Sequence, residues 1–256
     1  MPVLVTAGYG GEMDDDGVFD ERVAAGYDAD SSRMFAPEVL GPTLDVLERL
    51  AHGGRVLEFA SGTGRVALPL AERGLDVSGI ELSRAMTERL KAKPGADKVT
   101  VAIGDMTSTR VDGQFSLVYL VFNTIGNVLS QDGQVEVFRN AAAHLEPGGR
   151  FVVELFIPEL RRLLPGDTRV LFAAEEGYVG YDEYDVVGQQ LVSVHTSVTG
   201  EGAGSVFKTP QRFVWPAELD LMARLAGMTL ESRWADWDGS DFTAESESHV
   251  SVWVKH

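Results

Sequence analysis

Short apolar runs alternate with longer amphipathic segments through residues 55–156. Five runs have the length and apolar character of buried strands, and three intervening segments carry apolar residues at helical spacing. The expected strands are 55–59, 76–80, 98–103, 115–121 and 150–156, and the expected helices are 65–73, 83–90 and 130–145. Strands that alternate with helices in this way predict a parallel sheet that is covered on both faces.

Two further helices are predicted before the first strand. Residues 18–32 read as a short helix. Pro42 is suited to be the first residue of a second helix, which carries Leu44, Leu47 and Leu50 along one stripe. Residues 1–17 are rich in glycine and aspartate, and we expect a mobile N-terminus there.

The pattern changes near residue 167. Four segments of nearly alternating apolar and polar residues follow, at 169–172, 178–186, 191–198 and 205–214. They predict an antiparallel insertion over 167–214. A helix at 216–226 and strands at 228–237 and 249–255 then complete a sheet of seven strands. We therefore expect one domain over 18–256 that contains this insertion.

The charge and the cysteine content narrow the class of protein. The 256 residues include 22 Lys and Arg and 39 Asp and Glu, and the net charge is −17. Such a chain repels phosphate backbones and anionic membranes, so neither nucleic acid nor a membrane is an expected partner. The absence of cysteine excludes disulfides and zinc–thiolate sites and agrees with a cytoplasmic location. We find neither a signal peptide nor an apolar stretch long enough to span a bilayer.

The segment from Val56 to Arg65 reads as a buried strand, a glycine turn and the start of a helix. Gly62 and Gly64 let a ligand approach the backbone closely, and the helix N-terminus offers free N–H groups. The same residues match the G-x-G-x-x-A fingerprint of dinucleotide sites, so a nicotinamide-dependent oxidoreductase is one interpretation. An ordinary tight turn is another.

Acidic residues at the ends of the first three strands help to separate these interpretations. Glu58 can engage the amino group of a methionine moiety, and a pyrophosphate site has no use for it. Glu81 ends the second strand, where an acid can accept hydrogen bonds from both ribose hydroxyls. Asp105, in Gly104-Asp105-Met106, can accept from an adenine amine, with Met106 against the ring. Asp105 as a simple turn cap is the alternative.

Together these motifs resemble those of the class I S-adenosylmethionine (SAM)-dependent methyltransferases. E-x-x-x-G-x-G at 58–64, the acid at Glu81 and G-D-M at 104–106 resemble the first three motifs of that family. Residues 115–123 resemble the fourth, although Ser116 stands where the family often has Asp. The resemblance implies an α/β fold with a Rossmann-like, doubly wound, mostly parallel sheet. It also implies SAM as cofactor and S-adenosylhomocysteine as product.

The overall layout is similar to the bacterial small-molecule branch of the family, which often has an antiparallel insertion after the fifth strand. The resemblance implies a small-molecule acceptor, and a homodimer through the insertion is a hypothesis. The residues that it assigns to the cofactor are Tyr27, Glu58, Ala60, Gly62, Thr63, Gly64, Glu81, Leu82, Met86, Gly104, Asp105, Met106, Val121, Phe122 and Asn123. For Tyr27, a packed aromatic anchoring the N-terminal helix is an alternative of equal weight.

Methyl transfer from a sulfonium is an in-line displacement with a good leaving group, so alignment and desolvation supply most of the catalysis. Candidate catalytic residues are Tyr27, Asn123 as a positioning group, and His195, for which a structural role within its strand is the alternative. We expect methylation of nitrogen or oxygen rather than carbon, and no metal site. A non-catalytic SAM-binding protein remains an alternative.

A run of acidic and aromatic residues at 175–185 stands out within the insertion. One interpretation is the solvated edge of a lid. The other is a cage for a cationic amine.

Overall fold

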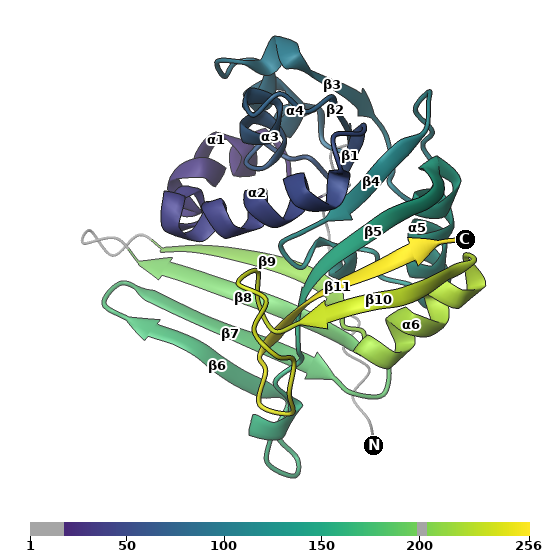
Figure 1. Cartoon of the computed structure of the whole chain (residues 1–256). Helices are drawn as coiled ribbons and strands as arrows, with labels where there is room; N and C mark the ends of the chain where they lie inside the picture. The colour runs from purple at the N-terminus through teal and green to yellow at the C-terminus, as the bar shows by residue number, and fades with distance from the viewer. Residues whose placement is uncertain (1–17, 199–203) are drawn as a thin grey trace.

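The computed structural model describes residues 18–198 and 204–256, which form two β-sheets and the helices around them (Figure 1). The predicted mobile N-terminus, 1–17, lies outside the described residues. None of the described helices is long and apolar enough to cross a membrane.

The larger sheet has seven strands in the order β10-β11-β5-β4-β1-β2-β3. Their bounds are β1 Val56–Phe59, β2 Val77–Glu81, β3 Val99–Ile103, β4 Phe115–Leu120, β5 Leu145–Phe156, β10 Met228–Trp234 and β11 Ser248–Lys255. β11 runs opposite to the other six strands, so its pairings with β5 and β10 are antiparallel and the remaining pairings are parallel. The strand order reverses between β1 and β4, and ligands of doubly wound sheets bind at such a switch point. The predicted fold class is confirmed.

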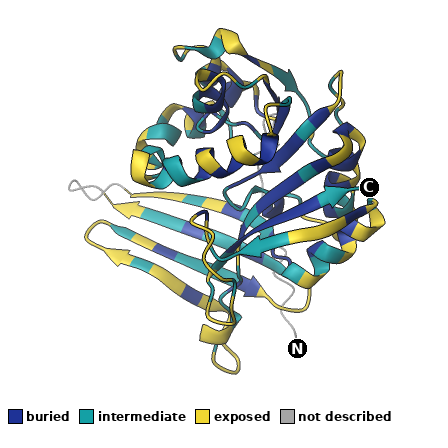
Figure 2. Ribbon diagram, viewed as in Figure 1, coloured by how far each residue is buried: buried dark blue, intermediate teal, exposed yellow. Residues whose placement is uncertain are grey.

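Helices cover both faces of this sheet. On one face α2 (Pro37–Ala51) and α3 (Ala67–Glu72) pack on alternate residues of the strands. On the other face lie α5 (Gln131–His144) and α6 (Pro216–Leu225). Figure 2 shows the central strands as the most buried part of the molecule. The remaining helices are α1 Glu21–Asp30, α4 Arg84–Lys91 and the 3₁₀ turns η1 Ser32–Phe35, η2 Ala96–Lys98, η3 Thr124–Asn127 and η4 Leu160–Arg162.

One predicted helix start is wrong. The second helix begins at Pro37, and Pro42 lies inside it rather than at its first residue. A proline inside a helix removes one hydrogen bond to the carbonyl four residues earlier. Here that carbonyl belongs to Glu38, which is exposed, so water can satisfy it. Leu44, Leu47 and Leu50 are buried, as the stripe predicts.

The insertion forms a second, four-stranded antiparallel sheet in the order β6-β7-β8-β9. Its strands are β6 Arg169–Glu175, β7 Tyr178–Asp185, β8 Gln190–Val198 and β9 Gly204–Arg212. In Figure 1 this sheet projects beside the larger one, below α1 and α2. Val170, Tyr184, Leu191 and Phe213 form a small core of its own on the face turned toward the rest of the molecule.

Candidate functional site

The glycine turn after β1 lies at the carboxyl edge of the parallel strands. Ala60, Gly62 and Gly64 all have left-handed backbone, with φ of 54°, 54° and 83°. An alanine there costs about 1 kcal/mol, and such strain is typical of functional turns. A Cβ on Gly64 would lie 2.9 Å from Leu68 and from Leu90, whereas one on Gly62 would meet nothing within 4 Å. Gly64 is therefore needed for packing, and Gly62 leaves open space where a ligand can lie.

Glu81 ties this turn to the end of β2. Its Oε2 accepts a hydrogen bond from the Gly62 N–H at 2.7 Å, and its Oε1 accepts one from the Ser83 N–H at 2.8 Å. The carboxylate is buried and its orientation is fixed by two backbone groups. Ser83 in turn caps α4 by accepting from the Met86 N–H. A preorganised acceptor therefore stands beside the glycine turn.

Glu58 lies beneath the same turn, pointing from β1 into the side of the sheet that α3 covers. It is buried, and its Oε2 has no hydrogen-bond partner among the described residues. Burial raises the pKa of this carboxyl to about 8, although the positive charge of Arg65 opposes the shift. A cation close to Glu58 would stabilise its ionised form.

The end of β3 brings the third motif to the same edge. Gly104 N–H donates to the Glu81 carbonyl at 2.9 Å. Asp105 is exposed, and its Oδ1 accepts from the Thr107 N–H at 2.7 Å, so it does cap a turn. Its other carboxylate oxygen is available for a ligand. Met106 packs against the core on the α5 side, and Leu82 remains exposed.

Helix α1 covers the glycine turn from outside. Thr63 donates its hydroxyl hydrogen to Asp28 at 2.5 Å, and Lys93 forms an ion pair with the same carboxylate. Tyr27 lies on α1 edge-to-face with Phe19, and burial raises the pKa of its hydroxyl. Met86 is buried beneath α1 beside Ala24, so its predicted contact with the cofactor stays a prediction.

The segment that follows β4 also has left-handed backbone, here at two successive residues. Phe122 and Asn123 have φ of 59° and 61° in succession, and neither is glycine. Their conformation is held because the Phe122 N–H donates to Glu154 Oε2 at 2.7 Å, and Trp237 donates to Oε1 of the same carboxylate at 2.9 Å. The Asn123 amide donates to Gln211 of β9 at 2.7 Å. The turn after β4 is thus joined to the insertion.

A cavity of about 1230 Å³ lies between α1, this turn and the insertion sheet. Tyr27, Asn123 and His195 all line it, so the three candidate catalytic residues share one space. The Nδ1 of His195 is 2.6 Å from the Tyr178 hydroxyl, and burial lowers the pKa of the imidazole. A neutral imidazole at neutral pH follows from that shift.

Sequence reasoning missed several residues of this site. They are Asp28, Arg65, Glu154, Gln211 and Trp237. The Arg65 guanidinium lies 5.2 Å from the centroid of the Phe122 ring, so its charge stands at the glycine turn. Glu154 carried a usable signal, because it is the one acid within the apolar run 150–156. Gln211 carried none, since its role depends on how the insertion packs.

The known proteins that this chain is similar to are methyltransferases. The sequence model of the methyltransferase domain family matches residues 56–149. The solved structure of the methyltransferase CcbJ from Streptomyces caelestis is 34% identical and covers 95% of this chain and 100% of its own, with a TM-score of 0.83.

Two other relatives extend the likeness. The cypemycin N-terminal methyltransferase of a Streptomyces species is 28% identical over 243 residues, which are 94% of this chain and 98% of that protein. A SAM-bound amino pentose methyltransferase from Micromonospora echinaspora shares the fold, with a TM-score of 0.68 over 90% of this chain and 96% of that one at 20% identity.

Proposed function

Because the chain belongs to the class I SAM-dependent methyltransferases, we propose that it transfers the methyl group of SAM to an amine nitrogen of a small molecule. The observation that carries the proposal is the cavity, which is lined by Phe122 and Asn123 after the end of β4 and by Tyr27 of α1. Nitrogen is favoured because relatives that match along at least nine-tenths of the chain and are named for their reaction include N-methyltransferases, whereas the C-methyltransferases match less than half of it.

The residues at the carboxyl edge fit the cofactor. The orphaned Oε2 of Glu58 matches a methionine ammonium, and the open space above Gly62 admits a ligand next to the backbone. Arg65 stands where it can face the methionine carboxylate, Glu81 is oriented to accept from ribose hydroxyls, and Asp105 keeps one acceptor oxygen for adenine. SAM supplies an electrophilic methyl group on a sulfonium.

The chain's own residues then have to align the acceptor and exclude water. Tyr27 and Phe122 both line the cavity, and we assign them the border between the cofactor and the acceptor. Asn123, held by Gln211 and by the Phe156 N–H, keeps one amide hydrogen with which it can orient the acceptor. His195, whose imidazole burial keeps neutral, can take up a proton only by relay, because the Tyr178 hydroxyl donates to its Nδ1 and keeps its own oxygen free to accept from a ligand.

Titration calorimetry with SAM tests the cofactor site. We expect Glu81→Ala to weaken SAM binding at least about 10-fold, because the hydrogen bonds to the ribose are lost. Glu88→Ala, an exposed acid on α4, is the matched control and should leave the affinity unchanged. Wild-type protein that binds no SAM would overturn the proposal.

Turnover distinguishes an enzyme from a non-catalytic SAM-binding protein. Release of S-adenosylhomocysteine with a panel of small amines supports the enzyme, whereas tight SAM binding without release from any acceptor supports the binding protein. The nicotinamide oxidoreductase is not favoured, because relatives along the whole chain are methyltransferases.

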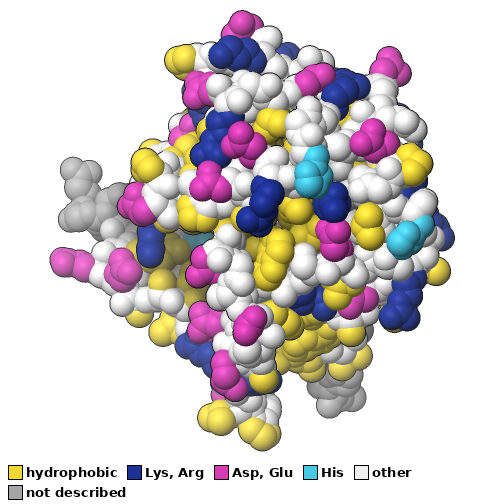
Figure 3. Space-filling view, viewed as in Figure 1, with side chains coloured by type: hydrophobic (Ala, Val, Ile, Leu, Met, Phe, Trp, Pro, Cys, Tyr) yellow, Lys and Arg dark blue, Asp and Glu magenta, His cyan; other side chains and the backbone are white. Residues whose placement is uncertain are grey.

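We also infer a cytoplasmic protein that does not bind nucleic acid. The net charge of −17 supports this, and Figure 3 shows acidic and basic side chains mixed on the viewed face. Binding to duplex DNA at physiological salt would contradict it.

A homodimer through the insertion is a further proposal. The face of the insertion sheet turned away from the cavity exposes Leu171 and Val179, at 49% and 42% of their areas. Exposed apolar residues grouped on one sheet face are typical of contact surfaces. Sedimentation should give a dimer that Val179→Glu converts to a monomer, and a wild-type monomer would sink the idea.

A further inference from the structure

The inner face of the insertion sheet is the wall of the cavity opposite α1. Side chains alternate along a strand, so residues of β7 two apart point to the same face. Tyr178, Asp182 and Tyr184 line the cavity, whereas Glu183 lies on the other face, paired with Arg169. The acidic and aromatic run is therefore divided between the two faces, and each earlier interpretation fits one of them.

Asp182 begins a chain of hydrogen bonds across the inner face. Ser193 lies opposite Asp182 in the β7–β8 register, and its hydrogen bond partly offsets the rise that burial causes in the pKa of the Asp182 carboxyl. The Ser193 Oγ is 3.2 Å from Nε2 of His195, whose Nδ1 is 2.6 Å from the Tyr178 hydroxyl.

The proton positions in this chain follow from its end group. An ionised carboxylate only accepts, so the Ser193 hydroxyl donates to Asp182 and accepts the Nε2–H of His195. The Tyr178 hydroxyl then donates to Nδ1. Each N–H or O–H group of these four side chains donates to another of them. The groups that remain for a ligand are lone pairs on Asp182 and Tyr178, which can only accept.

Aromatic rings surround the middle of the chain. The rings of Phe172, Tyr178 and Phe207 lie 5.4, 6.1 and 6.0 Å from the His195 ring, centroid to centroid. Gly180, opposite His195 in the register, makes room for this arrangement, because a Cβ there would lie 2.2 Å from the Phe172 ring. Aromatic faces beside acceptor groups are what a cation binds best.

The formal charges around the cavity also favour a cation. Its lining includes the carboxylates of Asp30, Glu159, Asp182 and Glu247, and the guanidinium groups of Arg22 and Arg212.

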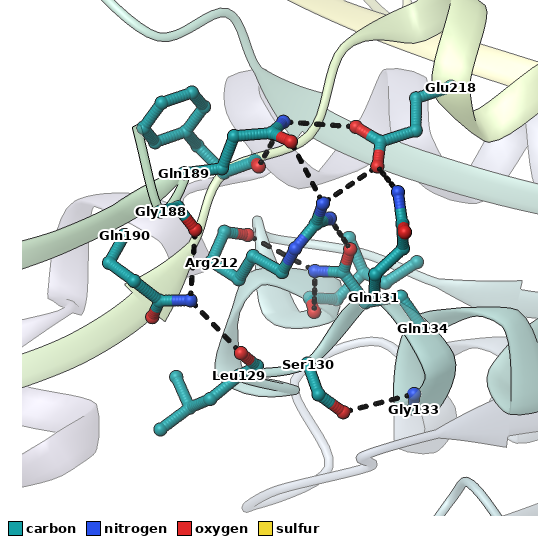
Figure 4. A network of polar contacts seen from close by, with 12 residues as sticks. Leu129, Ser130, Gln131, Gly133, Gln134, Gly188, Gln189, Gln190, Arg212 and Glu218 are labelled. Carbon is teal, nitrogen blue, oxygen red and sulfur yellow. Dashed lines mark hydrogen bonds and ion pairs between the residues drawn. The ribbon is translucent and has the colours of Figure 1, made fainter. Parts of the chain in front are cut away.

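Arg212 does not offset these carboxylates, because other groups already bind it. It donates to Glu218 at 2.7 Å, to Gln134 at 2.5 Å and to Gln189 at 3.0 Å (Figure 4). Among the charged residues that line the cavity, Arg22 of α1 is then the one cation that faces four carboxylates.

We infer that the inner face of β7 and β8 recognises a positively charged amine group of the acceptor, with Asp182 as the residue that determines this specificity. Tyr178 and His195 position the chain and close the site with their rings. The inference rests on the proposed function, because it assigns the acceptor's chemistry to the cavity where methyl transfer is placed. A nitrogen attacks the methyl group only as the free base, so a bound ammonium that is itself methylated first gives its proton to the Tyr178 oxygen while the Tyr178 hydroxyl proton passes to Nδ1 of His195.

Two probes of the same shape, one charged and one neutral, show how much of the binding affinity depends on the positive charge. The cation is (4-hydroxyphenyl)trimethylammonium, and 4-tert-butylphenol is its neutral isostere. Protein loaded with S-adenosylhomocysteine is titrated with each and followed by ligand-observed NMR, so no methyl donor is present. We expect the cation to bind at least about 10-fold more tightly than the isostere.

Asp182→Asn should remove most of this preference and leave the affinity for the isostere unchanged. Glu183→Gln, one residue away on the opposite face, is the matched control and should keep the preference. Tyr178→Phe, which breaks the bond to His195, should weaken the cation alone by about threefold. Unchanged melting temperature and SAM affinity establish that each variant is folded.

The outcomes separate this inference from the proposed function. Normal SAM binding with equal affinity for both probes, or a preference that survives Asp182→Asn in a folded variant, overturns the inference and leaves methyl transfer standing. Absence of SAM binding by the wild type instead overturns the proposed function.

Discussion

At the scale of single residues, Glu58 is the most perturbed carboxyl of the proposed cofactor site. Its carboxyl is buried without a partner for Oε2, and burial raises its pKa from an ordinary 4.5 to about 8. Protein without cofactor therefore holds the group largely protonated at neutral pH. A methionine ammonium beside it would favour the ionised form.

Glu58 should make the cofactor-free protein less stable as the pH rises. Its folded pKa is above the unfolded one, so its stabilising contribution is complete below pH 4.5 and is lost as the pH rises through about 8. We expect Glu58→Gln to gain stability relative to wild type by about 3 kcal/mol between pH 5.5 and 8.5. Thermal unfolding at both values measures this.

Because Glu58→Gln is compared with wild type at each pH, the contributions of the other titrating groups to the free energy of unfolding cancel. Glu72→Gln, an exposed acid on α3, should show no such gain. A difference between Glu58→Gln and wild type that does not change with pH would rule out the buried, protonated carboxyl.

At the scale of elements, the insertion is fixed to the main sheet through Arg212. This side chain is buried at the end of β9 and reaches Glu218 of α6 and Gln134 of α5. Gln134 also donates to the carbonyls of Ile125 and Arg212. One network thus joins two helices, η3 and the insertion (Figure 4).

Breaking this network should cost stability without affecting the cofactor site. Arg212→Met leaves Glu218 partly buried without its cation, and we expect a loss of about 3 kcal/mol in the free energy of unfolding. Adding Glu218→Gln should recover part of the loss. Arg169→Met, which removes an exposed pair with Glu183, is the control and should change stability by less than about 1 kcal/mol. Equal effects of the two arginine substitutions would refute this role.

Most elements were predictable because their signals are local. Apolar runs fixed the strands, and serine caps such as Ser83 and Ser130 fixed helix starts within a residue or two. Pro42 misled because a first-turn proline and an exposed interior proline look the same in a sequence. The bounds of the helix then depend on Pro37, which is equally suited to the first position.

At the scale of the whole molecule, the predictable part of the site is the part that strand ends determine. Carboxyl ends of parallel strands meet at one edge, so Glu58, Glu81 and Asp105 could be grouped without coordinates. Contacts across separate units, such as Asp28 with Thr63 and Asn123 with Gln211, depend on packing that no local pattern encodes. The sequence shows that alternate residues of β7 lie on opposite faces of the sheet. It does not show which of the two sets faces the cavity.

The net charge of −17 acts on any cation over distances longer than a contact. Salt screens such attraction, with a Debye length of about 10 Å at 0.1 M. We expect the affinity for the cationic probe to fall about threefold between 50 and 500 mM NaCl, while that of the neutral isostere does not fall. Titrations at both salt concentrations measure this, and Asp182→Asn should retain part of the salt dependence. A parallel loss for both probes would exclude electrostatic attraction.

The insertion leaves the main sheet after β5 and returns at α6, so the acceptor wall is one continuous stretch of chain. An exchange needs two junctions and partners for Asn123 and Gln134, and it leaves untouched the strand ends where we propose that the cofactor binds. On the proposed function, exchanging this stretch would change the acceptor and leave the site of the methyl donor in place. A chimera carrying a relative's stretch, with an arginine kept at position 212, should retain SAM affinity and adopt the relative's acceptor, and loss of SAM binding in a folded chimera would show that the two halves are not separable.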